Sequence, residues 1–191
     1  IHSATKLMDG QGRVLGGVTV GSKELIRELF LFARNTGASL SPFNAWVLSK
    51  SLETLAVRVD RHCDNAFTIA EKLEVSQNIN WVKYPFLKSH PQYALAKKQM
   101  LKGGNIIAFE VIGGLEAGQN FINAIELCSL SSNLGDSRTI ITHPASTTHS
   151  KLTKEDRMAV GITDGMIRLS IGLEHPEDIW NDLKNALSKI G

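Results

Sequence analysis

The first residues of the chain combine side chains that could hold a cofactor. The stretch His2-Ser3-Ala4-Thr5-Lys6 places one lysine beside two hydroxyls, and four glycines follow between Gly10 and Gly17. A deprotonated lysine attacks carbonyl carbons, most often to form a Schiff base with an aldehyde cofactor, and hydroxyls donate hydrogen bonds to phosphate. Lys6 is therefore a candidate catalytic residue, with Ser3 and Thr5 as candidate phosphate ligands. The alternative is a solvated surface lysine beside a turn.

A second candidate is Arg168, which lies in the middle of the apolar run Met166–Ile171. A buried guanidinium is costly unless it meets a carboxylate, and its planar fork suits the two oxygens of an amino acid's α-carboxylate. Two structural alternatives remain open at this point. Arg168 could point to water from an edge strand, or it could pair with an internal acid such as Asp164.

A polar stretch between residues 133 and 149 allows two further interpretations, both of them weaker. Gly135-Asp136-Ser137 is similar to the nucleophile motif of some esterases, but a match of three residues occurs often by chance. His143 and His149 could bind a metal together with Cys63 or His62. Their spacing is not that of a helical zinc motif, so we expect no metal site.

The composition excludes several classes of function. The net charge of +2 arises from 21 basic and 19 acidic residues that are interspersed, so we expect no binding of nucleic acid. No apolar run approaches the length of a membrane span. Cys63 and Cys128 are far apart and lack CxxC spacing, which predicts a reducing, cytoplasmic location. The expected partners are small molecules or other protein chains.

The first part of the chain must contain the elements that position Lys6. Residues 14–20 are β-branched and flanked by glycines, which predicts a buried strand beside the lysine segment. Ser22 and Gly37 are typical start and stop signals of a helix. Ser41-Pro42 starts a second helical pattern, which resumes after residue 57 and predicts one long or bent helix that joins two domains.

After about residue 75 the pattern alternates between strands and helices, which predicts a compact α/β layer structure. The segment 144–151 is expected to be a loop because it is rich in Ser and Thr. The expected strands are 79–82, 106–112, 128–134, 137–142 and 166–171, and the expected helices are 91–101, 115–127, 154–160 and a last one from Pro176.

Taken together, these motifs give the chain a specific likeness. It resembles the fold-type I pyridoxal-phosphate enzymes of cysteine and methionine metabolism over nearly its whole length and in the family's order. The motifs that carry the resemblance are Ser3-Ala4-Thr5-Lys6 with Gly16-Gly17, Ser41-Pro42-Phe43-Asn44-Ala45-Trp46, Leu52-Glu53-Thr54-Leu55, Leu134-Gly135-Asp136, His143-Pro144-Ala145-Ser146 and Ile167-Arg168-Leu169-Ser170-Ile171-Gly172.

The resemblance implies a fold and a set of residue roles. Residues 1–57 would be the end of the large domain that binds pyridoxal 5'-phosphate, with the connecting helix, and residues 58–191 a small C-terminal α/β domain with an antiparallel-type sheet. Lys6 would form the Schiff base with the cofactor, and Ser3 and Thr5 would bind its phosphate. Arg168 would bind the substrate carboxylate, with Asn133 beside it.

Within the family, the stretch from Asn133 to Asp136 with Thr147-Thr148-His149 resembles the sulfhydrylases that act on O-succinylhomoserine or O-acetylhomoserine. This likeness implies a γ-replacement with sulfide that yields homocysteine in methionine biosynthesis. Cystathionine γ-synthase, cystathionine γ-lyase and methionine γ-lyase are the nearest alternatives. Many such enzymes have serine where Asn133 stands, so the asparagine favours a sulfhydrylase without settling the substrate. An alternative of another class is a non-catalytic chain that acts only through protein partners.

The resemblance also implies residues that this sequence does not contain. Members of the family are about twice as long, so we expect the 191 residues to be the second half of a longer protein. The first half would supply the remaining groups around the cofactor, and the intact protein would form a homotetramer, as a dimer of dimers. The 191 residues alone are therefore expected to be inactive.

Overall fold

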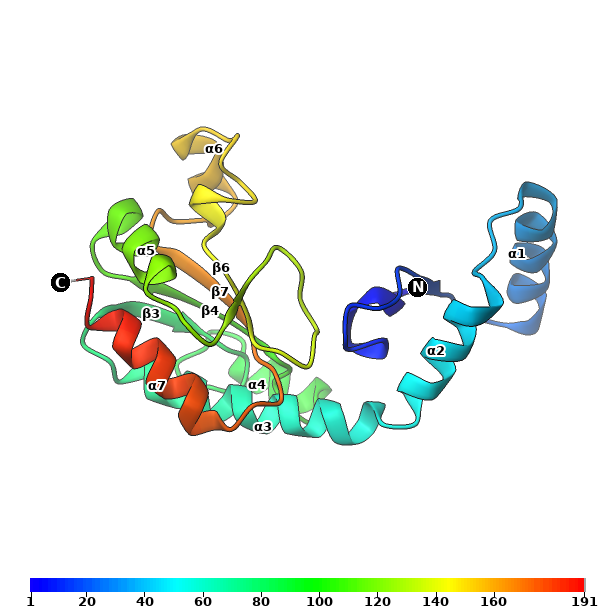
Figure 1. Cartoon of the computed structure of the whole chain (residues 1–191), viewed down its shortest axis with the longest axis horizontal. Helices are drawn as coiled ribbons and strands as arrows, with labels where there is room; N and C mark the ends of the chain where they lie inside the picture. The colour runs from blue at the N-terminus through cyan, green and yellow to red at the C-terminus, as the bar shows by residue number, and fades with distance from the viewer. Residues whose placement is uncertain (191) are drawn as a thin grey trace. The chain divides into compact units, whose positions relative to one another are not determined.

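The computed structural model describes residues 1–190 of the chain (Figure 1). The chain divides into two compact units, one of Ile1–Val57 and one that starts at Arg58. Their assignment to the large and small domains of the implied fold stays a prediction. Within the described residues, no helix has both the length and the apolar character needed to cross a membrane.

The first unit begins with a small hairpin that surrounds the lysine segment. Strand β1 (His2–Ser3) pairs antiparallel with β2 (Gly17–Val18), and the short helical turn η1 (Ala4–Met8) lies between them in sequence. The strand predicted over residues 14–20 is thus limited to two residues, because β1 offers only two residues for pairing. Val14 is buried in a small cluster with Ala4, Val47 and Leu48.

The helices of this part follow the capping signals of the sequence. Helix α1 (Lys23–Thr36) starts where the Ser22 hydroxyl accepts a hydrogen bond from the amide of Leu25, and it ends at Gly37 with a φ of 77°. Helix α2 (Pro42–Leu52) is capped in the same way by Ser41. The predicted long or bent helix is interrupted at Glu53 and Thr54, after which α3 (Leu55–Glu74) begins.

The second unit is built on a five-stranded sheet. All neighbouring strands are antiparallel except β5 and β6, so the sheet is mixed rather than purely antiparallel. The order β3-β4-β7-β6-β5 places β7 in the interior of the sheet, between β4 and β6. The strands are β3 (Ile79–Lys83), β4 (Ile106–Val111), β5 (Ser129–Leu130), β6 (Ile140–Thr142) and β7 (Met166–Ser170).

Helices of the second unit cover one face of the sheet, and the hydrophobic core lies between them and the sheet (Figure 1). Ile107 and Phe109 of β4, and Ile167 and Leu169 of β7, are fully buried against α3, α5 and α7. Phe109 meets Phe121 of α5 edge to face, with ring centroids 5.8 Å apart. The other helical elements are α4 (Tyr93–Gln99), α5 (Gly114–Asn123), η2 (Pro144–Ser146), α6 (Lys154–Ala159) and α7 (Pro176–Leu187).

Alternation along β7 decides where Arg168 lies. Successive side chains of a strand point to opposite faces, so burial of Ile167 and Leu169 in the core puts Arg168 on the other face. Its cross-strand partners are Ala108 on β4 and Thr142 on β6. The hydrophobic pattern of one strand thereby fixes the direction of its charged residue.

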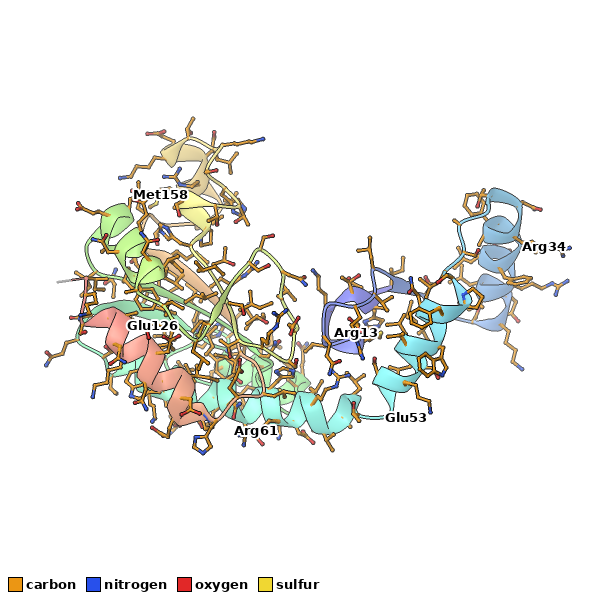
Figure 2. All side chains as sticks on the ribbon, viewed as in Figure 1. Arg13, Arg34, Glu53, Arg61, Glu126 and Met158 are labelled. Carbon is orange, nitrogen blue, oxygen red and sulfur yellow. The ribbon has the colours of Figure 1, made fainter. Side chains whose placement is uncertain are left out.

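One buried carboxylate fixes the chain where α5 leads into β5. Asp182 of α7 accepts hydrogen bonds from the amides of Glu126, Leu127 and Cys128 at 2.8, 3.0 and 3.0 Å (Figure 2 labels Glu126). These amides therefore do not continue the helix, which was predicted to reach residue 127 but ends at Asn123. The carboxylate sets the start of β5.

We expect Asp182→Asn to destabilise the protein, because the amide side chain replaces one of two acceptor oxygens with a donor that faces backbone N–H groups. The expected loss of unfolding free energy is about 1.5–3 kcal/mol, measured by urea denaturation. Asp178→Asn, on the exposed side of the same helix, is the control and should cost well under half as much. Equal unfolding midpoints for the two variants would contradict this role.

Candidate functional site

The backbone around Lys6 is held in a defined turn. The amides of Ala4 and Thr5 both donate to the carbonyl of Gly16, at 2.9 and 3.3 Å. The Lys6 carbonyl accepts from the amide of Gly10 at 2.8 Å, and Lys6 itself has non-helical dihedral angles of φ −89° and ψ −127°. The lysine thus lies half-buried on a closed loop rather than on a freely solvated turn.

The loop after Lys6 is fixed by an ion pair that the sequence analysis missed. The Asp9 carboxylate is fully buried and accepts from Arg13 Nε at 3.0 Å and from the amide of Val14 at 3.2 Å. Arg13 Nη2 also donates to the Ser51 hydroxyl at 2.7 Å, which joins this loop to α2 (Figure 2). The one available signal was an Asp and an Arg four residues apart around a glycine-rich turn.

The two hydroxyls near Lys6 differ in their availability to a ligand. The Thr5 hydroxyl accepts from the Gly16 amide at 3.0 Å and donates to the Gly16 carbonyl at 3.3 Å. Ser3 is exposed, and its hydroxyl makes no hydrogen bond to any described residue. An amine beside an unused hydroxyl fits an aldehyde that carries a phosphate. Ser3 fits a phosphate directly, whereas Thr5 would first have to release Gly16.

Arg168 lies in the interior strand β7, so the edge-strand alternative is wrong. The alternative of a pair with Asp164 is also wrong, because that carboxylate binds Lys154 and Arg157, each at 2.8 Å. Arg168 Nη2 instead donates to uncharged oxygens, those of Ser132 O at 2.9 Å, Asn133 O at 3.0 Å and Thr142 Oγ1 at 3.3 Å. Burial lowers the pKa of the Arg168 guanidinium.

The guanidinium keeps two of its three nitrogens available to a ligand. All three of its hydrogen bonds use Nη2, and within residues 1–190 neither Nε nor Nη1 of Arg168 has a partner and no carboxylate forms an ion pair with it. The N–H groups of Nε and Nη1 are therefore available to the oxygens of a carboxylate. Asn133 is the neighbour expected from the resemblance, and its contact uses the main-chain oxygen.

The structure brings the predicted site residues together in two groups. Ser3, Thr5 and Lys6 share the loop of the first unit, and Asn133 and Arg168 are in contact in the second unit. Their roles as ligands of cofactor and substrate stay predictions.

The histidines considered as metal ligands have other partners. His143 is fully buried, with Nε2 2.7 Å from the carbonyl of Asp164 and Nδ1 2.8 Å from the Ser146 hydroxyl. His62 Nδ1 donates to the carbonyl of Ile171 at 2.7 Å. The part of the chain that the structure describes contains no group of three or more His, Cys, Asp or Glu residues able to hold a metal ion.

The esterase interpretation finds no support in the contacts of Ser137. Its hydroxyl donates to the carboxylate of Asp136 at 3.3 Å, and this carboxylate pairs with Arg138. No histidine approaches the Ser137 hydroxyl among the described residues, so it lacks the base that a nucleophilic serine requires.

The two buried histidines predict how stability depends on pH. Burial lowers the pKa of both His62 and His143 below the ordinary value of 6.5. The unfolded chain therefore binds protons below about pH 6.5 that the folded chain does not bind, and this favours unfolding as the pH falls. We expect the free energy of unfolding to decrease from pH 7.5 to pH 5.5 in urea titrations, and His143→Gln to reduce this slope. A stability that rises over the same range would contradict the prediction.

Comparison with known proteins gives one consistent result. Residues 1–188 match the family described as Cys/Met metabolism PLP-dependent enzyme. The chain is 49% identical to an L-methionine gamma-lyase of Porphyromonas gingivalis over 192 aligned positions, which cover 100% of this chain and 48% of that protein. It is 45% identical to an O-succinylhomoserine sulfhydrylase of Pseudomonas aeruginosa, covering 100% of this chain and 47% of the relative.

Solved structures agree with the sequence relatives. The crystal structure of a cystathionine gamma synthase from Xanthomonas oryzae, in complex with aminoacrylate and cysteine, superposes with a TM-score of 0.92 at 40% identity. The match covers 99% of this chain and 49% of that one. The chain therefore spans about half the length of the relatives it matches. The α/β fold and the family expected from the sequence motifs are confirmed.

Proposed function

Because the chain belongs to the Cys/Met metabolism PLP-dependent enzymes, we propose that the intact protein replaces the acyloxy group of an acylhomoserine with sulfide. The substrate would be O-succinylhomoserine or O-acetylhomoserine, and the product homocysteine. The observation that supports amino-acid chemistry most directly is Arg168, a half-buried guanidinium whose Nε and Nη1 have no partner, and which pairs with no carboxylate, among the described residues. The similarity to O-succinylhomoserine sulfhydrylases supports the choice of leaving group.

The two units would divide the work as the resemblance implies. Residues 1–57 would be the end of the large cofactor-binding domain, and the residues from 58 onward the small C-terminal domain. The intact protein would be a cytoplasmic homo-oligomer, a dimer of dimers. Apolar side chains that stay exposed on α1 and α2 support a larger assembly, with Phe30, Phe32 and Trp46 each more than half exposed.

Pyridoxal 5'-phosphate would be held by residues of the first unit. Lys6 Nζ would bond to its aldehyde carbon, and the hydroxyls of Ser3 and Thr5 would bind its phosphate. When bound, the cofactor supplies the electron sink that spreads the negative charge formed at the substrate Cα.

The side chains of this protein would orient the substrate and move its protons. Arg168, with Asn133 beside it, binds the α-carboxylate, which directs the Cα–H bond for removal. Lys6 Nζ would take the proton from Cα, pass it on to the cofactor and, as a free amine again, take one from Cβ, so that the acyloxy group leaves Cγ with its bonding electron pair. Sulfide forms the new bond at Cγ, and Lys6 returns the protons, giving homocysteine and a free carboxylate.

A lyase of the same family is the second candidate, supported by similarity to methionine gamma-lyases at 44–49% identity. In our proposal, cystathionine γ-synthase and cystathionine γ-lyase would use the same residues as the sulfhydrylase. All of these enzymes act at Cγ or Cβ of an amino acid. Incubation of the intact protein with each acylhomoserine plus sulfide, with acylhomoserine plus cysteine, and with methionine separates them by product. Homocysteine formation as the fastest reaction supports the sulfhydrylase. Faster release of methanethiol from methionine would favour the lyase.

Lys6→Ala in the intact protein should lower turnover by more than about 10³-fold, because no other residue supplies the amine that bonds to the cofactor and moves protons. Borohydride reduction followed by peptide mapping should attach the cofactor to Lys6 in the parent protein and leave the variant unlabelled. Lys23→Ala, an exposed lysine at the start of α1, is the control. Substantial γ-replacement by the Lys6 variant would overturn the assignment, and an intact protein that takes up no cofactor would support the non-catalytic alternative.

Arg168→Leu should weaken binding of amino-acid substrates by about 10- to 100-fold, the value of a charge-assisted hydrogen bond, while turnover at saturation changes less. The measurement is the KM and kcat of the preferred reaction in the intact protein. Arg168→Lys should recover part of the affinity, since it keeps the charge without the planar fork. An unchanged KM for the leucine variant would remove Arg168 from the substrate site.

A further inference from the structure

The hydroxyl of Thr142 contacts the candidate carboxylate-binding group and also the loop that holds this group. Thr142 is the cross-strand partner of Arg168 and is 4% exposed. Its Oγ1 donates to the carbonyl of Ser131 and accepts from Arg168 Nη2 at 3.3 Å. Since a hydroxyl has one proton, donation to Ser131 leaves a lone pair of Oγ1 for the guanidinium.

The loop that Thr142 binds leaves the sheet at this end, where the Asn133 amide also donates to the Ser131 hydroxyl at 3.2 Å. Strand β5 has only two residues, and its pairing with β6 ends with the hydrogen bond from the Ser131 amide to the carbonyl of Ile141, at 3.3 Å. The next two carbonyls, of Ser132 and Asn133, are the ones that accept from Arg168 Nη2. The bond from Thr142 to the Ser131 carbonyl therefore fixes the chain immediately before both acceptors.

The other end of the loop is fixed by a second hydroxyl. The amide of Gly135 donates to Ser170 Oγ at 2.8 Å, and Ser170 is fully buried at the end of β7. Ser170, Arg168 and Thr142 all lie on the face of the sheet opposite the helices. The loop 131–135 is thus held at both ends by hydroxyls that flank the guanidinium.

Nη2 is directed by three acceptors, and this leaves the N–H groups of Nε and Nη1 for a ligand. Without the Thr142 hydroxyl, the guanidinium loses one acceptor directly, and the other two acceptors lose one of the contacts that position them. We expect the Arg168 guanidinium to stay at the site but to be less firmly oriented. Such a change affects carboxylate recognition and leaves recognition of the rest of the substrate intact.

We propose that Thr142 is a positioning residue that sets the orientation of Arg168 and thereby the affinity for the α-carboxylate of the substrate. The proposal rests on the proposed role of Arg168 as the carboxylate binder. It adds a side chain for which the resemblance to the family gave no role.

The test compares two ligands that differ only by the carboxylate. L-norvaline and butylamine share the amine and the carbon chain and have no leaving group, so both bind without turnover. Affinities are measured by calorimetric titration of the intact, cofactor-loaded protein. Thr142→Val, which replaces the hydroxyl with a methyl of similar size, should weaken L-norvaline binding about 3- to 10-fold and leave butylamine binding unchanged. In turnover, KM should rise by a similar factor with kcat retained.

Two further variants make the result specific. Thr142→Ser keeps the hydroxyl and should restore L-norvaline affinity to within about twofold of the parent. Thr68→Val is the matched control, because it removes a hydroxyl that donates to a backbone carbonyl, that of Asp64 within α3. It should change neither affinity. If Thr142→Val does not fold, Thr142→Ala replaces it with the same expected selectivity.

The outcomes separate this proposal from the one on which it rests. Equal weakening of both ligands, or no weakening of L-norvaline, in Thr142→Val overturns the positioning role. If Arg168→Leu abolishes the preference for L-norvaline while Thr142→Val does not reduce it, the carboxylate site stands and only the role of Thr142 fails. If Arg168→Leu keeps the preference, the carboxylate site itself is wrong, and the positioning role fails with it.

Discussion

A guanidinium in the interior of a sheet must find acceptors, and the second unit is arranged around this constraint. Core packing of Ile167 and Leu169 forces Arg168 onto the opposite face, where no carboxylate among the described residues reaches it. Neutral oxygens from a loop and from a neighbouring strand satisfy one of its nitrogens. A charge that is partly desolvated and only partly satisfied attracts an anion of matching shape. The apolar core thereby determines on which face of the sheet the guanidinium lies.

Elements with strong local signals could be predicted from the sequence. Ser22 and Ser41 cap the helices that they were expected to start, and Gly37 ends α1 in the left-handed conformation. Strands β4 and β7 lie within one residue of the expected segments, because each is a short, mostly apolar run bounded by glycines or polar turns. These features depend on neighbours a few residues away, and a single sequence contains that information.

Elements controlled by distant partners were predicted less well. Helix α5 ends early because Asp182, more than fifty residues later, binds the amides that would have continued it. Strand β5 has two residues instead of seven, since only that part of the segment meets β6. At the candidate site, the motif around Lys6 and the apolar run around Arg168 were visible, but the supports were not. Arg13 reaches Ser51 and Thr142 reaches Ser131 only through the tertiary fold.

The contacts around Lys6 join residues that are closer in sequence than those joined by the contacts of Arg168. Thr5 closes its loop with Gly16, eleven residues away, whereas Arg168 contacts residues 26 to 36 positions earlier. Because the entropy cost of closing a loop grows with its length, the lysine turn can form from a short stretch of chain. The arginine contacts require β5, β6 and β7 to be assembled first. The surroundings of Lys6 thus depend on contacts of shorter sequence range than the surroundings of Arg168, a difference set by the connectivity of the chain.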